Sequence, residues 1–514
     1  MMIGERKNTV RLDGMSLTLE DVLRVARDGW GVELDEEAAR KVEEASAAVK
    51  AWENSDDVVY GITTGFGDLA TVNISRKDRR LLQENLLKSH ACGVGEPFSE
   101  QITRAMMLLR INSLIRGFSG ISLATLHQFV AFLNLGITPV VPSQGSVGAS
   151  GDLCPLSHLA LPLLGHGKVR YKGRVMLAAK ALQAAGLKPV QLGAKEGLAL
   201  NNGTASMGAM GVVALMAAED LAKTADIAAA LSIEALHGVP YAFDARTHAL
   251  RAHRGQGRVA ENIRRLIEGS EIIEKHRFGR VQDAYSLRCV PQVHGATRDA
   301  LEYVRKTLET EINSVTDNPI IFTEDGVAIS GGNFHGQPLA LAMDFFGIAV
   351  AELASISERR QARLVDTSLS GLPPFLVEDS GLNSGFMIAQ YTSAALVSEN
   401  KVLAHPSSVD SIPTSANQED HVSMGAFSAR KALSILDNAR KVLAIELFAA
   451  SQALDFSRLL KPGAGTVAAH DCVRSVVPYL KHDEFLHPLI ERVETLLSRG
   501  AVVRAVEEAI GPLN

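Results

Sequence analysis

The sequence has little cysteine and no excess of basic residues. Only four of its 514 residues are cysteines, and no two form a CxxC pair, so neither a disulfide framework nor a cysteine-rich zinc site is expected. The 52 basic and 58 acidic residues give a net charge of -6, which provides no basic surface for nucleic acid or an anionic membrane. Scattered, reduced thiols favour a cytoplasmic location.

Long apolar runs and a secretory leader are also missing from the pattern. Residues 1–13 carry several charges and no apolar stretch, so no secretory signal is expected. The stretch Met207–Ala218 stops at acidic residues, and Asp344 interrupts the segment 339–356, so we expect no membrane span. There is no HExxH motif and no cluster of Cys and His, and hence no metal is expected.

Helical periodicity dominates what is present. Apolar residues recur at helical spacing over Arg298–Val315, as on one face of a helix. Three more segments are long, rich in alanine and sparsely charged: residues 207–237, 338–362 and 424–455. Helices that are apolar on most faces are buried. We therefore predict a mainly α fold, a large elongated helical bundle with a smaller, loop-rich N-terminal region. The predicted boundaries are an N-terminal region at 1–215, a central long-helix bundle at 216–460, and a C-terminal helical region at 461–514.

Strand patterns are rare, and glycine gathers in separate islands. The alternation of Val169–Val175 and of Ile320–Ile329 predicts strands, the second as a hairpin that turns at residues 324–326. Four glycine-rich islands lie between helical segments and are predicted to be loops: 61–67, 145–151, 193–203 and 331–336. Loops held by a rigid scaffold often carry functional groups, so functional residues are expected in these islands.

The second island ends in Ala149-Ser150-Gly151. A simple interpretation is a loop that caps a helix beginning near Asp152, because Asp and Ser are good caps and Pro155 suits a first helical turn. A phosphate-binding loop is not supported, since no GK[ST] follows. A serine-hydrolase elbow is not supported either, because the residue two positions after Ser150 is not glycine.

A chemical interpretation of the same tripeptide is possible. The Gly151 nitrogen can attack the Ala149 carbonyl, and loss of two waters, one from the Ser150 hydroxyl, leaves a five-membered ring with an exocyclic methylidene. Glycine provides an unhindered nitrogen and backbone freedom. A small alanine permits a compressed loop that stores strain until the ring closes. The N-terminus of the following helix would favour negative charge that develops at the ring.

This stretch resembles the signature of the aromatic amino acid ammonia-lyase family, and especially that of its histidine ammonia-lyases. The family forms 4-methylideneimidazole-5-one (MIO) autocatalytically from Ala-Ser-Gly. The similarity runs from about Val58 to about Met424, with several islands in the family's order. It implies that Ala149, Ser150 and Gly151 become MIO, with no metal or diffusible cofactor. It also implies a homotetramer whose sites are shared between subunits.

The resemblance implies roles around this group. Tyr60 would be the catalytic base that takes the β-proton. A free tyrosine titrates at roughly 10, so its phenolate needs stabilisation by dipoles or cations. Asn202 and Arg288 would hold the substrate's α-carboxylate, the arginine through a two-toothed ion pair. Gln282 would line the MIO side together with Tyr285, the latter as a catalytic residue.

The substrate ring would be bound by three further residues. By resemblance, His90 and Glu419 meet the imidazole, and Phe334 packs beside the MIO and the substrate. A carboxylate suits a ring with N–H donors and costs desolvation against a phenyl ring. The implied reaction converts L-histidine into trans-urocanate and ammonia. Thr63 and Gln337 depart from the histidine pattern, so a phenylalanine or tyrosine ammonia-lyase, or an MIO-dependent aromatic amino acid 2,3-aminomutase, stays open as an alternative.

Overall fold

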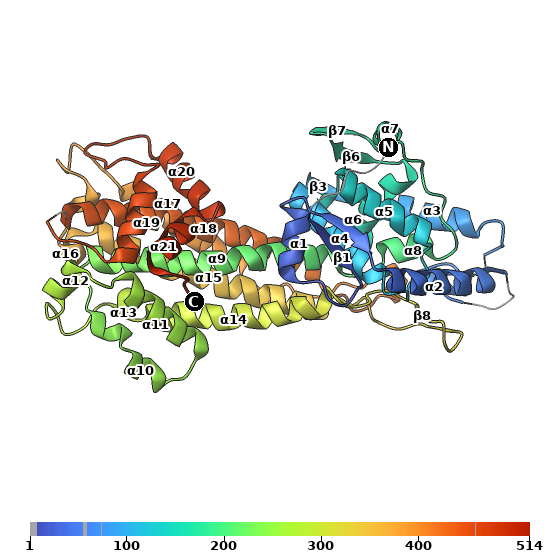
Figure 1. Ribbon diagram of the computed structural model, residues 1–514, viewed down its shortest axis with the longest axis horizontal. Helices are drawn as coiled ribbons and strands as arrows, with labels where there is room; N and C mark the ends of the chain where they lie inside the picture. Colours follow the sequence, from blue (N-terminus) through green and yellow to red (C-terminus); the bar gives the residue numbers. More distant parts are fainter. Residues whose placement is uncertain (1–7, 55–58, 73, 458) are drawn as a thin grey trace. The chain divides into compact units, whose positions relative to one another are not determined.

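The computed structural model describes residues 8–54, 59–72, 74–457 and 459–514 (Figure 1). Residues 1–7, over which no secretory leader is expected, lie outside the described residues, as does Val58, at the start of the family resemblance. The chain forms two compact units that are each discontinuous in sequence. Unit 1 comprises residues 1–213, 305–344 and 406–430, and unit 2 comprises 214–304, 345–405 and 431–514. The predicted mainly α fold is confirmed, because the described chain forms helices α1 to α21 and only four small sheets.

Unit 1 contains shorter helices and all the sheets of the described chain. Its helices are α1 (Leu19–Ala26), α2 (Glu36–Asn54), α3 (Arg79–His90), α4 (Glu100–Leu114), α5 (Leu123–Leu135), α6 (Leu153–Ala160), α7 (Ala178–Ala185) and α8 (Glu196–Asn201). Its strands are β1 (Thr9–Leu12), β2 (Gly31–Leu34), β3 (Val94–Pro97), β4 (Thr138–Pro139), β5 (Pro142–Gln144), β6 (Lys168–Tyr171), β7 (Arg174–Leu177), β8 (Ile320–Phe322) and β9 (Val327–Ile329). Strand β1 pairs with β2 in parallel, whereas β3–β5, β4–β6–β7 and β8–β9 pair antiparallel.

Helix α4 is the central helix of unit 1. It packs against α1 and α5 and is buried along almost its whole length. The Arg110 side chain on this helix is fully buried, and its guanidinium donates to the carbonyl oxygens of Ala199 and Thr316, each at 2.9 Å. Because a buried guanidinium needs acceptors, Arg110 ties α4 to two distant segments of the unit.

Two short elements differ from the sequence prediction and one agrees with it. The hairpin β8–β9 forms as predicted. The predicted strand Val169–Val175 is instead a hairpin of β6 and β7, because Lys172 and Gly173 adopt positive φ values of 51° and 73° and reverse the chain. The island 193–203, predicted to be a loop, contains the buried helix α8. The glycines of this island favoured the prediction of a loop, but tertiary packing stabilises its short apolar stretch as a helix.

Four long helices lie side by side in Figure 1, and the segments of these helices that belong to unit 2 form its core. They are α9 (Ala205–Ala235), α14 (Val290–Glu311), α15 (Gln337–Val365) and α18 (Gly425–Leu454), and the predicted long helices are thereby confirmed. Ser232 on α9 donates to Glu446 on α18 at 2.7 Å. Arg360 on α15 forms a fully buried ion pair with the same carboxylate.

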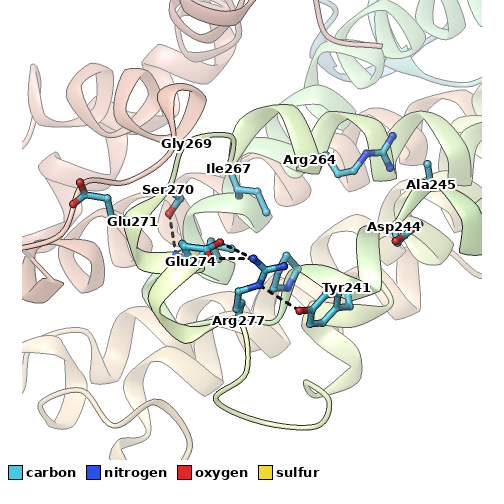
Figure 2. Close-up of a pocket in the computed structure, with 12 residues that line it drawn as sticks. Tyr241, Asp244, Ala245, Arg264, Ile267, Gly269, Ser270, Glu271, Glu274 and Arg277 are labelled. Atoms are coloured by element: carbon cyan, nitrogen blue, oxygen red, sulfur yellow. Dashed lines mark hydrogen bonds and ion pairs between the residues drawn. The ribbon is translucent and has the colours of Figure 1, made fainter.

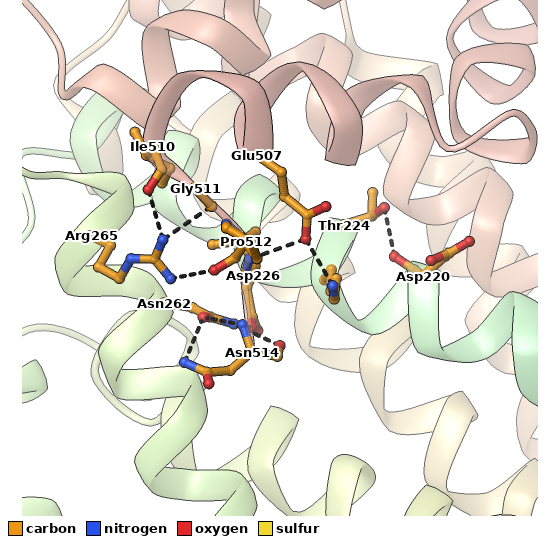
Figure 3. A network of polar contacts seen from close by, with 12 residues as sticks. Asp220, Thr224, Asp226, Asn262, Arg265, Glu507, Ile510, Gly511, Pro512 and Asn514 are labelled. Atoms are coloured by element: carbon orange, nitrogen blue, oxygen red, sulfur yellow. Dashed lines mark hydrogen bonds and ion pairs between the residues drawn. The ribbon is translucent and has the colours of Figure 1, made fainter.

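Shorter helices surround these in unit 2. They are α10 (Ala245–Ala249), α11 (Arg254–Leu266), α12 (Glu271–His276), α13 (Tyr285–Arg288), α16 (Thr367–Ser370), α17 (Met387–Leu403), α19 (Ala464–Arg474), α20 (Leu486–Ser498) and α21 (Ala501–Ile510). Polar contacts hold the C-terminal segment against α11 (Figure 3). Arg265 donates to the carbonyl oxygens of Ile510 and Pro512 at 2.7 and 2.6 Å, and Asn262 accepts from the Asn514 backbone N–H at 3.0 Å. Backbone carbonyls of the last turn and tail thus receive charged donors.

In the described part of the chain, two helices are long and apolar enough to cross a membrane by length and composition alone, although the sequence predicts no membrane span. They are Ala205–Ala235 and Gln337–Val365. The sequence prediction treats an isolated acidic residue as the end of an apolar run, whereas a mean hydropathy over a long window tolerates such a residue. In the structure, 72% and 61% of their most apolar windows are buried. Such burial is typical of the core helices of a soluble protein.

Candidate functional site

The tripeptide Ala149-Ser150-Gly151 lies in the turn between β5 and α6. Ser150 has a φ of 49° and Gly151 a φ of 76°, both in the left-handed region. The Gly203 backbone N–H donates to the Ser150 carbonyl at 3.3 Å. A Cβ added to Gly151 would lie 2.2 Å from the Gly203 carbonyl oxygen, so only glycine fits. A serine in the left-handed region costs on the order of 1 kcal/mol, which the surrounding contacts must sustain.

Asp152 follows the tripeptide and takes a role that the sequence did not reveal. Helix α6 begins after it as predicted, but its side chain does not cap α6. Instead the carboxylate accepts the backbone N–H groups of Ser206 and Met207, both at 2.9 Å, at the start of α9. Burial raises the pKa of Asp152 to about 7, although these two N–H groups oppose the shift. Asp152 thereby attaches the tripeptide to the N-terminus of a long helix.

The segment that follows Glu419 meets the tripeptide loop, and the island 331–336 meets that segment. The Val147 carbonyl accepts the Met424 N–H at 2.9 Å. The rings of His335 and His421 stack with centroids 5.7 Å apart. The half-buried Phe334, next to His335, therefore belongs to a segment in contact with the one that follows Glu419.

Tyr60, His90 and Glu419 form an electrostatically linked group in unit 1. The Tyr60 hydroxyl accepts the Gly67 backbone N–H at 3.1 Å. Burial raises the pKa of Tyr60, and the negative charge of Glu419 adds to this, while the Gly67 N–H opposes it. Burial lowers the pKa of His90, and Glu419 opposes that shift. All three side chains are partly buried, so their charges are only partly screened.

Asn202 precedes Gly203, which pairs with Gly151, and its side-chain amide is anchored by hydrogen bonds. Its Nδ2 donates to Asp317 Oδ1 at 3.2 Å and to the Asn318 carbonyl at 3.1 Å. The preceding Asn201 donates to the hydroxyl of Ser157 on α6 at 3.0 Å. Asn202 Oδ1 is buried, and no hydrogen-bond partner for it is found among the described residues. The Asn201-Asn202 pair therefore joins α8 to α6, the helix after the tripeptide, and to the segment 317–318.

Gln282, Tyr285 and Arg288 belong to unit 2, where Tyr285 and Arg288 contact each other. The Arg288 guanidinium carbon lies 4.7 Å from the centroid of the Tyr285 ring, a distance typical of a cation–π contact. The side chain of Tyr285 is 71% exposed. Asp283 between them is buried and accepts the Val239 N–H at 2.6 Å, which anchors the segment. Sequence reasoning named Gln282, Tyr285 and Arg288 but missed Asp283, because an acidic residue at a helix start usually faces solvent.

A pocket of about 780 Å³ in unit 2 contains none of the residues expected at the site. Figure 2 shows Tyr241, Arg264, Glu274 and Arg277 among the side chains that line it. Arg277 pairs with Glu274 at 3.0 Å and also donates to the Tyr241 hydroxyl at 3.3 Å. Arg264 donates to the Phe243 carbonyl at 2.6 Å. Tyr241, Glu274 and Arg277 bond to one another and Arg264 bonds to a backbone carbonyl, so these four side chains already have protein partners.

Comparison with known proteins identifies the family. The family model described as aromatic amino acid lyase matches residues 17–475. The chain belongs to this family. It is 53% identical to the histidine ammonia-lyase of Alkaliphilus oremlandii over 501 residues, which cover 98% of the chain and 99% of that protein. It is 55% identical to the histidine ammonia-lyase of Symbiobacterium thermophilum over 500 residues, which cover 97% and 99%.

Solved structures of aromatic amino acid lyase relatives agree with this assignment. The crystal structure of histidine ammonia-lyase from Trypanosoma cruzi matches with a TM-score of 0.91 and 44% identity, over 98% of this chain and 96% of that one. The tyrosine aminomutase of Streptomyces globisporus matches with a TM-score of 0.94 and 39% identity, over 98% and 100%. The aromatic amino acid lyase fold is thus shared by enzymes with different substrates, so the substrate must be argued from side chains.

Proposed function

We propose that this carbon–nitrogen lyase is a histidine ammonia-lyase, which converts L-histidine into trans-urocanate and ammonia. The observation that carries the proposal is the Glu419 carboxylate, which acts electrostatically on both Tyr60 and His90. A carboxylate in such a site gains a charged hydrogen bond from an imidazole N–H, whereas a phenyl ring would only desolvate it. The names of relatives 53% and 55% identical over nearly the full chain support the same substrate.

We also propose that Ala149, Ser150 and Gly151 close into MIO, with no metal or diffusible cofactor. The backbone fits such a ring, since the turn is left-handed at Ser150 and Gly151 and the Gly203 carbonyl excludes any side chain at Gly151. The closed ring would supply an electrophile that makes the amino group of the substrate a better leaving group.

The chain's own residues bind the substrate and move its proton. We propose that Arg288 pairs with the α-carboxylate and that Tyr60 removes the β-proton, after which the C–N bond breaks. Orienting the substrate in this way contributes on the order of 7 kcal/mol or more. The raised pKa of Tyr60 leaves little phenolate at neutral pH. The remaining proposed contacts to substrate or MIO come from His90, Asn202, Gln282, Tyr285, Phe334 and Glu419.

We propose a cytoplasmic homotetramer with sites shared between subunits and with no nucleic acid or membrane partner. Exposed aromatic and apolar side chains that precede Arg288 in the sequence support subunit contact: Phe278 is 79% exposed, Val281 100% and Tyr285 71%. Clustered exposed apolar groups typically mark interfaces. Light scattering during size-exclusion chromatography should give the mass of four chains, and a fully active monomer would contradict the shared site.

Thr63 is the residue that favours the alternative function, a phenylalanine or tyrosine ammonia-lyase or an aminomutase. The Thr63 hydroxyl is buried and accepts the Val59 N–H at 2.8 Å, so this residue shapes the turn that carries Tyr60. Its presence therefore says less about substrate than Glu419 does.

The test is to incubate purified protein with L-histidine, L-phenylalanine and L-tyrosine, and to identify the products by chromatography and ultraviolet absorbance. Urocanate from histidine is expected. β-Amino acids would indicate an aminomutase, and inert behaviour towards all three would overturn both assignments.

A further inference from the structure

The loop that carries Glu419 is closed at its base by Thr414. The Thr414 N–H donates to the Glu419 carbonyl at 3.0 Å, and the Glu419 N–H donates to the Thr414 carbonyl at 3.2 Å. The three residues that follow Thr414 all have positive φ: 50° at Ser415, 52° at Ala416 and 69° at Asn417. Such a run of non-glycine residues in the left-handed region persists only where neighbouring contacts hold it.

The Thr414 side chain adds a contact that acts on Glu419 directly. Its hydroxyl donates to Glu419 Oε2 at 2.9 Å, and both residues are half-buried. A carboxylate can only accept hydrogen bonds, so this bond engages one oxygen and leaves Oε1 for another donor. A glutamate side chain otherwise samples many rotamers, and the hydroxyl restricts which oxygen faces which neighbour.

The neighbours of Glu419 make its orientation consequential. Its charge acts on Tyr60 and on His90. The loop also packs closely on the turn that carries Tyr60, because a Cβ added to Gly67 would lie 2.6 Å from the Ser415 hydroxyl oxygen. A carboxylate released from Thr414 could rotate towards His90 and lose its alignment with a substrate ring.

We propose that Thr414 is a positioning residue for substrate selectivity: its hydroxyl holds Glu419 Oε2 so that Oε1 is offered to the imidazole N–H of the substrate. The inference rests on the proposed function, in which Glu419 binds that ring. An aligned carboxylate benefits only a substrate whose ring donates a hydrogen bond. Thr414 therefore favours histidine over phenylalanine without contacting either.

The test compares two substitutions that remove different parts of threonine. Thr414→Val keeps the branched shape and removes the hydroxyl, whereas Thr414→Ser keeps the hydroxyl and removes the methyl group. We expect Thr414→Val to raise KM for L-histidine about tenfold with a smaller change in kcat, as for loss of a hydrogen bond to a charged group. Thr414→Ser should stay within about twofold of the unmodified enzyme, well short of that loss. The reverse order would mean that threonine acts through its shape, and would overturn the inference.

A double-mutant cycle separates this inference from the proposed function. If Thr414 acts through Glu419, Thr414→Val should have no further effect on KM once Glu419→Ala is present. An equal loss in both backgrounds would show a general structural effect and overturn the inference alone. If Glu419→Ala leaves histidine turnover unchanged, the proposed role of Glu419 fails instead.

A matched control is Thr392→Val on α17, whose hydroxyl donates to the Ile388 carbonyl in its own helix at 3.1 Å. It should leave KM and kcat unchanged. The melting temperatures of all variants are compared, and a loss of activity with intact folding at position 414 but not 392 supports the inference. A loss at both positions contradicts it.

Discussion

The Lys195 ammonium and the Asp317 carboxylate form an ion pair of 2.7 Å in which both side chains are completely buried. The other Asp317 oxygen accepts from Asn202 Nδ2. Reversing the Asn202 amide would direct its oxygen at two acceptors, Asp317 Oδ1 and the Asn318 carbonyl, so the pair fixes which end of the amide is free. A residue expected to bind substrate is thus oriented by a buried ion pair.

The first prediction concerns this ion pair. Lys195→Met should destabilise the protein by about 3–5 kcal/mol, because it leaves the Asp317 carboxylate buried without its counter-ion. The measurement is the free energy of unfolding in urea. The double variant Lys195→Met with Asp317→Leu should recover part of the loss, since it removes the stranded charge. A single variant as stable as the double one would contradict this account.

The sequence did not indicate this ion pair. Nothing in the sequence links Asp317 to Lys195, 122 residues away. A lysine is rarely fully buried, and only the folded contacts of α8 with the segment after α14 reveal the pair.

The second prediction concerns the tripeptide. Ser150→Ala removes the hydroxyl that must leave during ring closure, so activity should be lost while the circular dichroism spectrum stays unchanged. Mass spectrometry of the peptide containing residues 149–151 should show the loss of two waters in the unmodified protein only. Ser143→Ala on β5 is the control and should keep both the mass loss and the activity. Full activity of Ser150→Ala would rule out MIO chemistry.

The third prediction concerns the pH dependence of Tyr60. Burial and the charge of Glu419 raise its pKa above the usual 10, against the opposing Gly67 N–H. A base that acts as phenolate should make kcat/KM increase from neutral to alkaline pH. Glu419→Gln removes the neighbouring charge, so the increase should shift to lower pH even though KM for histidine rises. The range from about pH 7 to about pH 9 lies below the tyrosine pKa of roughly 10. A decrease of kcat/KM over this range would contradict the role of Tyr60 as the base.

Long-range periodicity made the helical fold predictable, and local exceptions limited it. The long apolar helices α9, α15 and α18 carry their signal over many turns. Helix α8 was hidden by glycines on both sides, and its six residues are too few for a periodic signal. Asp152 looked like an ordinary helix cap, but its carboxylate binds the start of α9, more than fifty residues later in the sequence. Such contacts depend on the fold and leave no local pattern.

The sequence predicted the tripeptide 149–151 and the segments of Asn202 and Glu419 as parts of one site. The structure links the loop of the tripeptide to both segments. Thr414 was not predicted because a threonine five residues before a glutamate carries no signal of its own. Its role depends on a loop of left-handed residues that brings the two side chains together.

The fourth prediction concerns a buried carboxylate in unit 2. Asp226 is fully buried and contacts Arg298 at 2.6 Å, His294 at 2.7 Å and Asn262 at 2.9 Å. Burial opposes its ionisation, but these partners outweigh burial and hold the pKa of Asp226 below its usual 3.8. A lowered pKa in the folded state means that the carboxylate stabilises the fold above the unfolded pKa, and that this stabilisation is lost as the pH falls through the folded value.

Asp226→Asn should therefore lower the free energy of unfolding by about 3–5 kcal/mol at neutral pH, because Arg298 loses its buried counter-ion. The difference between the two proteins should stay constant down to roughly pH 4 and shrink only below it, where the unfolded chain takes up protons. Urea unfolding over a pH series measures both. Asp471→Asn, at a largely exposed carboxylate on α19, is the control and should change stability by less than about 0.5 kcal/mol. Both about pH 7 and about pH 5 lie above the ordinary aspartate pKa of roughly 3.9. If the stability difference caused by Asp226→Asn already becomes smaller between these two pH values, the pKa of Asp226 is raised instead, and burial outweighs Arg298.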